Sequence, residues 1–295
     1  MVNLLTFMES ANDGYVTIDD KGISKKLLTS VANRCGFGVM SMRENGRSYY
    51  KLKKIGIHCE KLYGRDERAT FNFLDIADLH LGHPSCEIAK IKSALDYALK
   101  KGVEYVFIAG DLFDGVYPGC ERKNVRNVFE NQMEIAISLF KKYPLDFRVI
   151  PGNHEFQFDY YGIQNPLSQL ECELRGEQCK FRAYSGYIQD FEIAGVIKRM
   201  MHLEAYYYHD NVFSTVQRLH EFKKHGGLKI KCDDGQKRPL RFLQCGHIHK
   251  TIEIYNPEFN VYISQPGSFV RQQNYYMPYI HVQGEVLDDL RIVRG

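Results

Sequence analysis

Four short clusters of carboxylate, amide and imidazole side chains are spaced along the chain, and each follows a run of apolar residues. They are Asp78-Leu79-His80, Gly110-Asp111-Leu112-Phe113-Asp114, Gly152-Asn153-His154-Glu155 and Gly246-His247-Ile248-His249. Asp, Asn and neutral His are ligands that suit Mn, Fe or Zn, and no thiolate accompanies them. Each cluster alone could be a turn or a solvated strand, but the four together predict a metal site.

The ligand types indicate a site for two metal ions. Two divalent ions held close together need one carboxylate that bridges them, with imidazoles and oxygens that complete each coordination shell. A pair of ions about 4 Å apart clamps the attacking and leaving oxygens of an in-line displacement and lowers the pKa of a bound water. Cleavage of a phosphate ester requires this chemistry.

Strands that alternate with helices must position these clusters. We expect strands over residues 71–77, 103–109 and 147–150 and amphipathic helices over residues 88–100 and 127–142. In an open α/β sheet, polar residues that follow the carboxyl ends of several strands meet in one crevice, although they are far apart in sequence. The expected fold is therefore an α/β layered sandwich, with mixed β-sheets flanked by helices.

The second half of the chain changes pattern. After residue 180 we expect strands and one further helix near residues 212–224, and residues 240–293 are mostly strand-like. We expect turns there at Pro257, at Pro266-Gly267 and at Asp288-Asp289. A further candidate ligand, less clear than the four clusters, lies in this half. His202, after residues 197–201, is preferred for it, with His209 as the alternative.

A small α+β module is expected over residues 1–66, before a catalytic domain over residues 67–295. Residues 23–35 have helical spacing, and Asn45-Gly46 between two short runs predicts a hairpin. The hairpin region is basic, with Arg43, Arg47, Lys51, Lys53 and Lys54. The module resembles a winged-helix fragment that could attract nucleic acid, and a packing or partner-docking module is the alternative.

Composition sets the cellular context. The 295 residues carry a formal net charge of +3 and contain neither an apolar run near the roughly 20 residues that span a bilayer nor a signal peptide at the start. We therefore expect a cytoplasmic protein without membrane association. The eight cysteines form no close pair, so we expect free thiols rather than disulfides or a thiolate zinc site.

The four clusters resemble the motif set of the calcineurin-like metallophosphoesterases, and the resemblance covers about residues 71–271. It implies that one metal is held by Asp78, His80, Asp111 and His249, with Asp111 bridging to the second. It implies that the second metal is completed by Asn153, His202 and His247. His154 would not bind metal; it would stabilise charge on the phosphate or protonate the leaving oxygen.

The residues of these motifs, together with Gln265-Pro266-Gly267-Ser268, are similar to those of SbcD-type DNA repair nucleases. This resemblance implies a nuclease or phosphodiesterase that hydrolyses nucleic-acid phosphodiester bonds with a metal-activated water, with two Mn²⁺ ions expected and Fe or Zn as alternatives. The expected partners are nucleic acid and an SbcC-like ATPase or another protein subunit. The oligomeric state is left open. Because the chain ends soon after Ser268, the DNA-capping domain of that group is not expected.

Two other functions compete with the nuclease. One is a phosphatase or phosphodiesterase that acts on small nucleotides or on phosphoproteins. The other is a scaffold subunit that keeps the fold without the activity. The full set of metal-type ligands argues against the scaffold, and the basic hairpin favours a nucleic-acid substrate over a small one.

Overall fold

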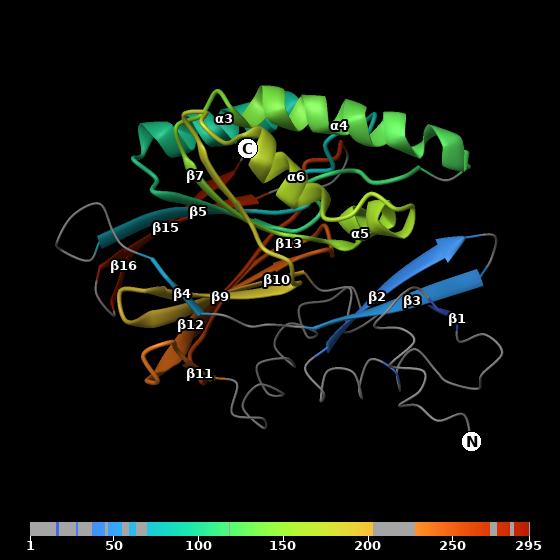
Figure 1. Cartoon of the computed structure of the whole chain (residues 1–295). Helices are drawn as coiled ribbons and strands as arrows, with labels where there is room; N and C mark the ends of the chain where they lie inside the picture. The colour runs from blue at the N-terminus through green and yellow to red at the C-terminus, as the bar shows by residue number, and fades with distance from the viewer. Residues whose placement is uncertain are drawn as a thin grey trace, which may run out of the picture.

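The computed structural model describes residues 16–17, 28, 37–44, 47–54, 59–62, 70–117, 119–202, 228–271, 276–283 and 286–294. Two β-sheets lie face to face, and helices cover the outer face of one of them (Figure 1). This arrangement confirms the predicted α/β layered sandwich. Within the described ranges, no helix has both the length and the apolar character needed to cross a membrane.

The sheet beneath the helices has six strands in the order β16-β15-β5-β6-β7-β8. Strands β5 to β8 are parallel, whereas β15 pairs antiparallel with β5 and with β16. The strands are β5 (Thr70–Ile76), β6 (Tyr105–Ala109), β7 (Asp146–Ile150), β8 (Lys180–Ala183), β15 (Tyr276–Gln283) and β16 (Val286–Arg294). The helical elements are α3 (Ile88–Lys100), the 3₁₀ turn η1 (Arg122–Asn124), α4 (Val125–Phe140), α5 (Asn153–Tyr160) and α6 (Pro166–Glu173).

The second sheet has seven strands, with β13-β14-β12-β10-β9-β4 in order and β11 paired with β12. Its central strands β10, β12 and β14 run parallel to one another, so the carboxyl ends of β10 and β12 lie at the same edge. The strands are β4 (Cys59–Lys61), β9 (Ile188–Ile193), β10 (Val196–His202), β11 (Lys229–Lys231), β12 (Lys237–Gly246), β13 (Thr251–Asn256) and β14 (Val261–Pro266).

Side chains alternate between two cores along the central strands, because successive residues of a strand point to opposite faces. On β5, Leu74 and Ile76 pack against the helices, whereas Phe73 packs between the two sheets. On β6, Ile108 faces the helices and Phe107 faces the second sheet. Both faces of these strands are therefore buried, which leaves the strand ends as the place where polar side chains can gather.

The N-terminal region contributes a three-stranded sheet with the order β1-β3-β2. Its strands are β1 (Val16–Thr17), β2 (Phe37–Glu44) and β3 (Arg47–Lys54). Glu44 pairs with Arg47 across the β2–β3 hairpin, which confirms the hairpin predicted at this position. Of the helix predicted over residues 23–35, only the helical residue 28 lies within the described residues. Strand β4 lies within residues 1–66, yet it pairs in parallel with β9 of the seven-stranded sheet.

Other predictions met different outcomes. The helix over residues 88–100 is confirmed at both ends, and the helix near residues 212–224 lies outside the described residues. The turn predicted at Asp288-Asp289 is wrong, because both residues lie within β16, where pairing with β15 outweighs their local turn preference. Helices α5 and α6 were not predicted. Both are only eight residues long, too short for a clear periodic pattern.

Candidate metal centre

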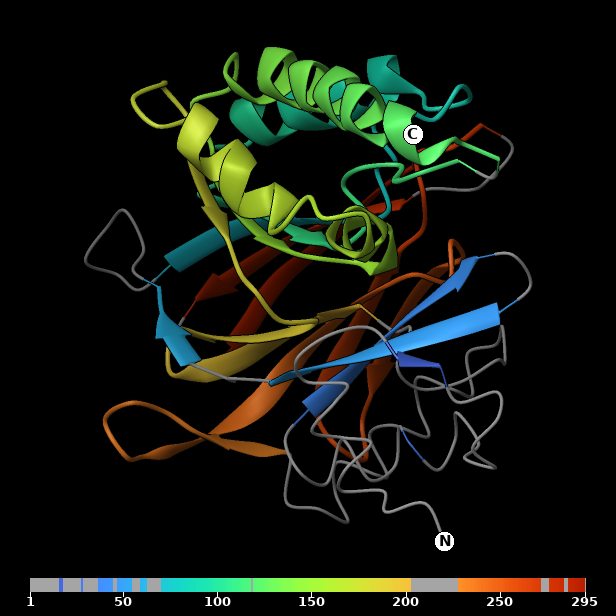
Figure 2. The same ribbon diagram turned by 45° about the vertical axis from the view of Figure 1, so that its right-hand side comes forward.

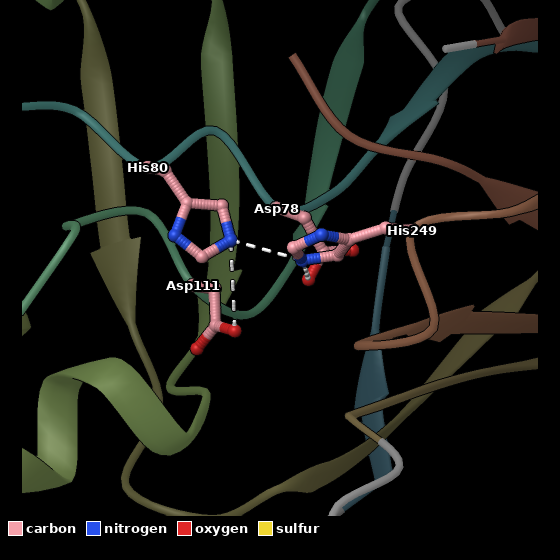
Figure 3. Close-up of side chains that lie close together, drawn as sticks. All are labelled: Asp78, His80, Asp111 and His249. Atoms are coloured by element: carbon pink, nitrogen blue, oxygen red, sulfur yellow. Dashed lines mark hydrogen bonds and ion pairs between the residues drawn. The ribbon is translucent and has the colours of Figure 1, made fainter. Parts of the chain in front are cut away.

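The structure brings all seven predicted ligand residues and His154 together at one edge of the two facing sheets. His202 is the last residue of β10, the others follow β5, β6, β7 and β12, and all of these strands end at this edge. Ligand atoms of Asp78, His80, Asp111 and His249 lie within 4.8 Å of one another (Figure 3). Ligand atoms of Asp111, His202 and His247 form a second group within the same limit. Asp111 belongs to both groups, as a bridging carboxylate must.

In the first group, two imidazoles face each other through ring nitrogens. Nε2 of His80 lies 3.0 Å from Nε2 of His249, and 3.9 Å from Oδ2 of Asp111. Nδ1 of His80 lies 3.3 Å from Oδ1 of Asp114, so a proton on Nδ1 leaves Nε2 with its lone pair toward the centre. Nε2 of His249 also lies 3.5 Å from Oδ1 of Asp78. These lone pairs and carboxylate oxygens converge on one point.

In the second group the tautomer of His202 is fixed by the backbone. Nδ1 of His202 donates to the carbonyl oxygen of Ala109 at 2.8 Å, which leaves the Nε2 lone pair of the neutral ring facing inward. This Nε2 lies 3.0 Å from Oδ1 of Asn153 and 3.3 Å from Oδ2 of Asp111. Nδ1 of His247 lies 2.9 Å from the same Asn153 oxygen.

The carboxylates and imidazoles of the two groups shift one another's pKa values. Burial lowers the pKa of His202, but the adjacent Asp111 carboxylate outweighs burial and raises it to about 10. Burial and the neighbouring His202 lower the pKa of His247 to about 4, which favours the neutral imidazole that a metal requires. The donor set, with oxygens and imidazoles but no thiolate, therefore fits divalent ions.

The backbone at the ligand positions is unusual. Asp78, His80, Asp111, His247 and His249 have φ angles of 51°, 48°, 48°, 87° and 54°, respectively. These are five of the eight described non-glycine residues with positive φ, a conformation that costs free energy and gathers at functional sites. Strained loops of this kind aim side chains that a regular strand or helix would direct elsewhere.

Gly152 allows helix α5 to approach the bridging carboxylate. A Cβ atom at Gly152 would lie 2.1 Å from Oδ1 of Asp111, which no real contact permits. The close approach lets the backbone N–H of His154, in the first turn of α5, donate to that oxygen at 2.9 Å. The N-terminus of α5 thereby holds Asp111 in place and stabilises its negative charge.

His154 lies at the open side of the centre, where its side chain is 27% exposed. Its Nδ1 contacts the carbonyl oxygen of Asp114, and its Nε2 lies 4.0 Å from Oδ2 of Asp111. Burial lowers the pKa of His154, but Asp111 and the Asp114 carbonyl outweigh burial and raise it. The ring is thus anchored through one nitrogen, and the other nitrogen is directed toward the centre.

Two supporting residues were not assigned a role from the sequence. Glu155 is 1% exposed, and it accepts hydrogen bonds from the backbone N–H groups of Gly152 at 2.6 Å, Phe113 at 2.8 Å and Asp111 at 3.2 Å. It therefore joins the loops after β6 and β7. Burial, and then the charge of Asp111, raise its pKa to about 7. The only sequence signal for this role was its place beside His154.

Ser268 is the second supporting residue. Its Oγ donates to the carbonyl oxygen of Asp78 at 2.9 Å, and the Asp78 carboxylate accepts the backbone N–H of His247, 3.0 Å from each oxygen. Ser268 thus holds the loop that carries Asp78, and Asp78 holds the loop that carries His247. The sequence signal for Ser268 was the Gln265-Pro266-Gly267-Ser268 motif. Nothing in its spacing indicated a contact with Asp78.

The remaining histidines separate clearly. His202 lies in the cluster, whereas its alternative His209 falls outside the described residues. His83 lies close to His80 in sequence. Its Nδ1 accepts a hydrogen bond from the backbone N–H of Ser85 at 3.0 Å, so we assign His83 a structural role.

The chain is similar to several known proteins. Part of the chain is 31% identical, over 125 residues, to the DNA polymerase II small subunit of Archaeoglobus fulgidus, and the match spans 41% of this chain and 24% of that protein. An archaeal phosphodiesterase structure is similar, with 13% identity, a TM-score of 0.45 and coverage of 76% of this chain and 100% of that one. Zinc-bound Vps29 of Entamoeba histolytica is similar, with 13% identity, a TM-score of 0.39 and coverage of 76% and 98%. Residues 71–262 match the family described as calcineurin-like phosphoesterase, and the chain belongs to that family.

Proposed function

We propose that the protein is a dinuclear metal-dependent phosphodiesterase that hydrolyses phosphodiester bonds of nucleic acid. The observation that carries the proposal is the convergence of two ligand groups on the shared carboxylate of Asp111, with His154 at the open side. A matching fold alone would not suffice, because unrelated activities share folds.

The proposal gives the residues two roles, metal binding and proton transfer. Asp78, His80 and His249 would hold one ion, Asn153, His202 and His247 the other, and Asp111 both. Bound ions would polarise the phosphate and supply an activated water. Nδ1 of His154 is anchored at Asp114, so Nε2 can deliver a proton to the leaving oxygen or stabilise charge on the phosphate.

Three observations support a nucleic-acid substrate. The motif residues resemble those of SbcD-type nucleases, and a relationship to that group stays a prediction. The matched relative from Archaeoglobus fulgidus is a subunit of a DNA polymerase, although the chain spans only 24% of its length. The basic β2–β3 hairpin also contacts α5, the helix that begins with Asn153 and His154. We propose that this hairpin helps to hold the substrate.

One observation favours the alternative, a phosphoesterase that acts on small nucleotides or on phosphoproteins. Nζ of Lys51, one of the five hairpin cations, lies 2.8 Å from Oδ2 of Asp159 on α5. This lysine is engaged within the protein, which lowers the charge that the hairpin can offer to phosphates.

A substrate panel separates the two proposals. The purified chain, loaded with Mn²⁺, is assayed on single- and double-stranded DNA, on RNA, and on a generic phosphodiester and phosphomonoester. We expect hydrolysis of nucleic acid that chelation and Asp111→Ala abolish and that the control His83→Ala retains. Hydrolysis of small esters alone would transfer the assignment to the alternative. No hydrolysis of any substrate by the metal-loaded chain would refute both.

A further inference from the structure

One face of helix α5 leads away from the metal centre. His154, Gln157 and Tyr161 are spaced i, i+3 and i+7, so they lie along the same face of the helix and its C-terminal cap. At a rise of 1.5 Å per residue, Tyr161 lies about 10 Å along the axis from His154. Tyr161 therefore marks a position about two helical turns from the metal centre.

The segment after Asp114 follows the same face. The carbonyl oxygen of Asp114 contacts His154, and the backbone N–H of Val116 donates to Oε1 of Gln157 at 2.7 Å. The guanidinium carbon of Arg122 lies 5.9 Å from the centre of the Tyr161 ring. The helix face and this segment thus form one continuous edge, with a catalytic imidazole at one end and an arginine–tyrosine pair at the other.

Aromatic rings gather at the far end of this edge. The Tyr161 ring lies 5.2 Å from that of Tyr160, which lies 5.5 Å from that of Tyr49 on β3. Tyr117, on the segment after Asp114, is 53% exposed and lies outside these ring contacts. Figures 1 and 2 both show the β2–β3 hairpin beside α5, and Tyr49 on this hairpin contacts Tyr160 on the helix.

We propose that Tyr161 and Arg122 form a platform on which unpaired bases of a single-stranded nucleic acid stack, about 10 Å along the α5 axis from His154. Every base has a π face, so aromatic side chains bind single strands without regard to sequence, and arginine adds attraction to rings and phosphates. A base-paired duplex hides these faces. The proposal rests on the nucleic-acid substrate proposed above.

Binding provides a test that does not depend on activity. The full chain, loaded with Mn²⁺, is titrated into a fluorescent oligodeoxythymidylate with a hydrolysis-resistant phosphorothioate backbone, and into a blunt duplex of the same chemistry. We expect Tyr161→Ala to weaken single-strand binding by roughly 5- to 150-fold, with little change for the duplex. Tyr161→Phe should restore binding, because the stacking ring is kept. Arg122→Ala should reduce the salt slope on the single strand by about 0.7.

Two controls separate the platform from fold support and from the proposed hydrolysis. Tyr255 on β13 is 53% exposed, whereas Tyr161 is half-buried against the helical core, and Tyr255→Ala should leave both affinities unchanged. Tyr161→Ala should leave turnover of a small generic phosphodiester unchanged. Unaltered single-strand affinity in Tyr161→Ala, equal losses on single strand and duplex, or lost turnover of the small diester would each overturn the platform. If the wild type cleaves nucleic acid while Tyr161→Ala binds normally, only the platform fails. If the wild type binds single strands through Tyr161 but cleaves none, only the hydrolysis fails.

Discussion

Replacement of Lys198 by methionine should destabilise the fold strongly, because Lys198 forms a buried ion pair between the two sheets. Its Nζ, on β10, lies 2.7 and 2.9 Å from the two carboxylate oxygens of Asp75 on β5. The side chains are 0% and 1% exposed. The rings of Phe73 and Phe107 lie 4.7 and 4.6 Å from the ammonium group, so the cation also has aromatic faces on two sides.

Lys198→Met keeps the length of the side chain but leaves the Asp75 carboxylate without its cation. Loss of one partner of a buried pair costs about 3–5 kcal/mol, against total stabilities of about 5–15 kcal/mol. Burial raises the pKa of Asp75, and Lys198 opposes that effect. Without Lys198 the pKa of folded Asp75 should rise further above the unfolded value of about 3.9. The folded variant then holds its proton more tightly than the unfolded chain, so stability should fall as pH rises through this window.

Urea unfolding followed by circular dichroism at pH 5 and pH 8 tests this prediction. The loss should be larger at pH 8, and Asp75→Leu combined with Lys198→Met should recover much of it, because no lone charge remains buried. The matched control is Arg126→Met, which removes an exposed pair with Glu130 and should cost less than about 0.5 kcal/mol. A cost of Lys198→Met below about 1 kcal/mol, or a double variant no more stable than the single one, would show that the buried pair does not stabilise the fold.

Three further predictions concern the centre itself. Asp111→Ala should remove both metals, measured by elemental analysis, and nearly all turnover; retention of two ions would exclude Asp111 as the bridge. His154→Ala should keep the metals and lower turnover by about 10²- to 10⁴-fold, whereas His83→Ala should change neither; loss of metal would make His154 a ligand. Glu155→Gln should weaken metal affinity by about 10- to 100-fold, since its hydrogen bonds position the loop of Asp111, and an unchanged affinity would show that this loop holds its shape alone.

The location of the centre could be predicted because it follows from strand order alone. Asp78, Asp111 and Asn153 each follow a strand of apolar residues, and parallel strands end at one edge. The preference for His202 over His209 used the same logic, and the structure places His202 beside Asp111. The ligand roles of these residues stay predictions until a metal is bound.

The contacts that hold the centre in shape could not be predicted, since they join residues without a sequence relation. Ser268 donates to Asp78 across 190 positions, and Glu155 reaches Asp111 only because α5 begins there. The prediction of a turn at Asp288-Asp289 was wrong for a related reason. Pairing of β16 with β15 determines the conformation there, not local preference. Strand β4 likewise joins the seven-stranded sheet through partners more than a hundred residues away.

Anomalous diffraction at the manganese edge, from crystals grown with Mn²⁺, would locate the ions of a dinuclear centre bridged by Asp111. We expect two peaks about 3.5–4 Å apart. One should lie among Asp78, His80 and His249, the other among Asn153, His202 and His247, with Asp111 between them. Ligand atoms of His80, Asp114 and His154 also lie within 4.8 Å of one another. A single peak at full occupancy, or a peak among these three residues in place of either expected one, would exclude the bridged pair.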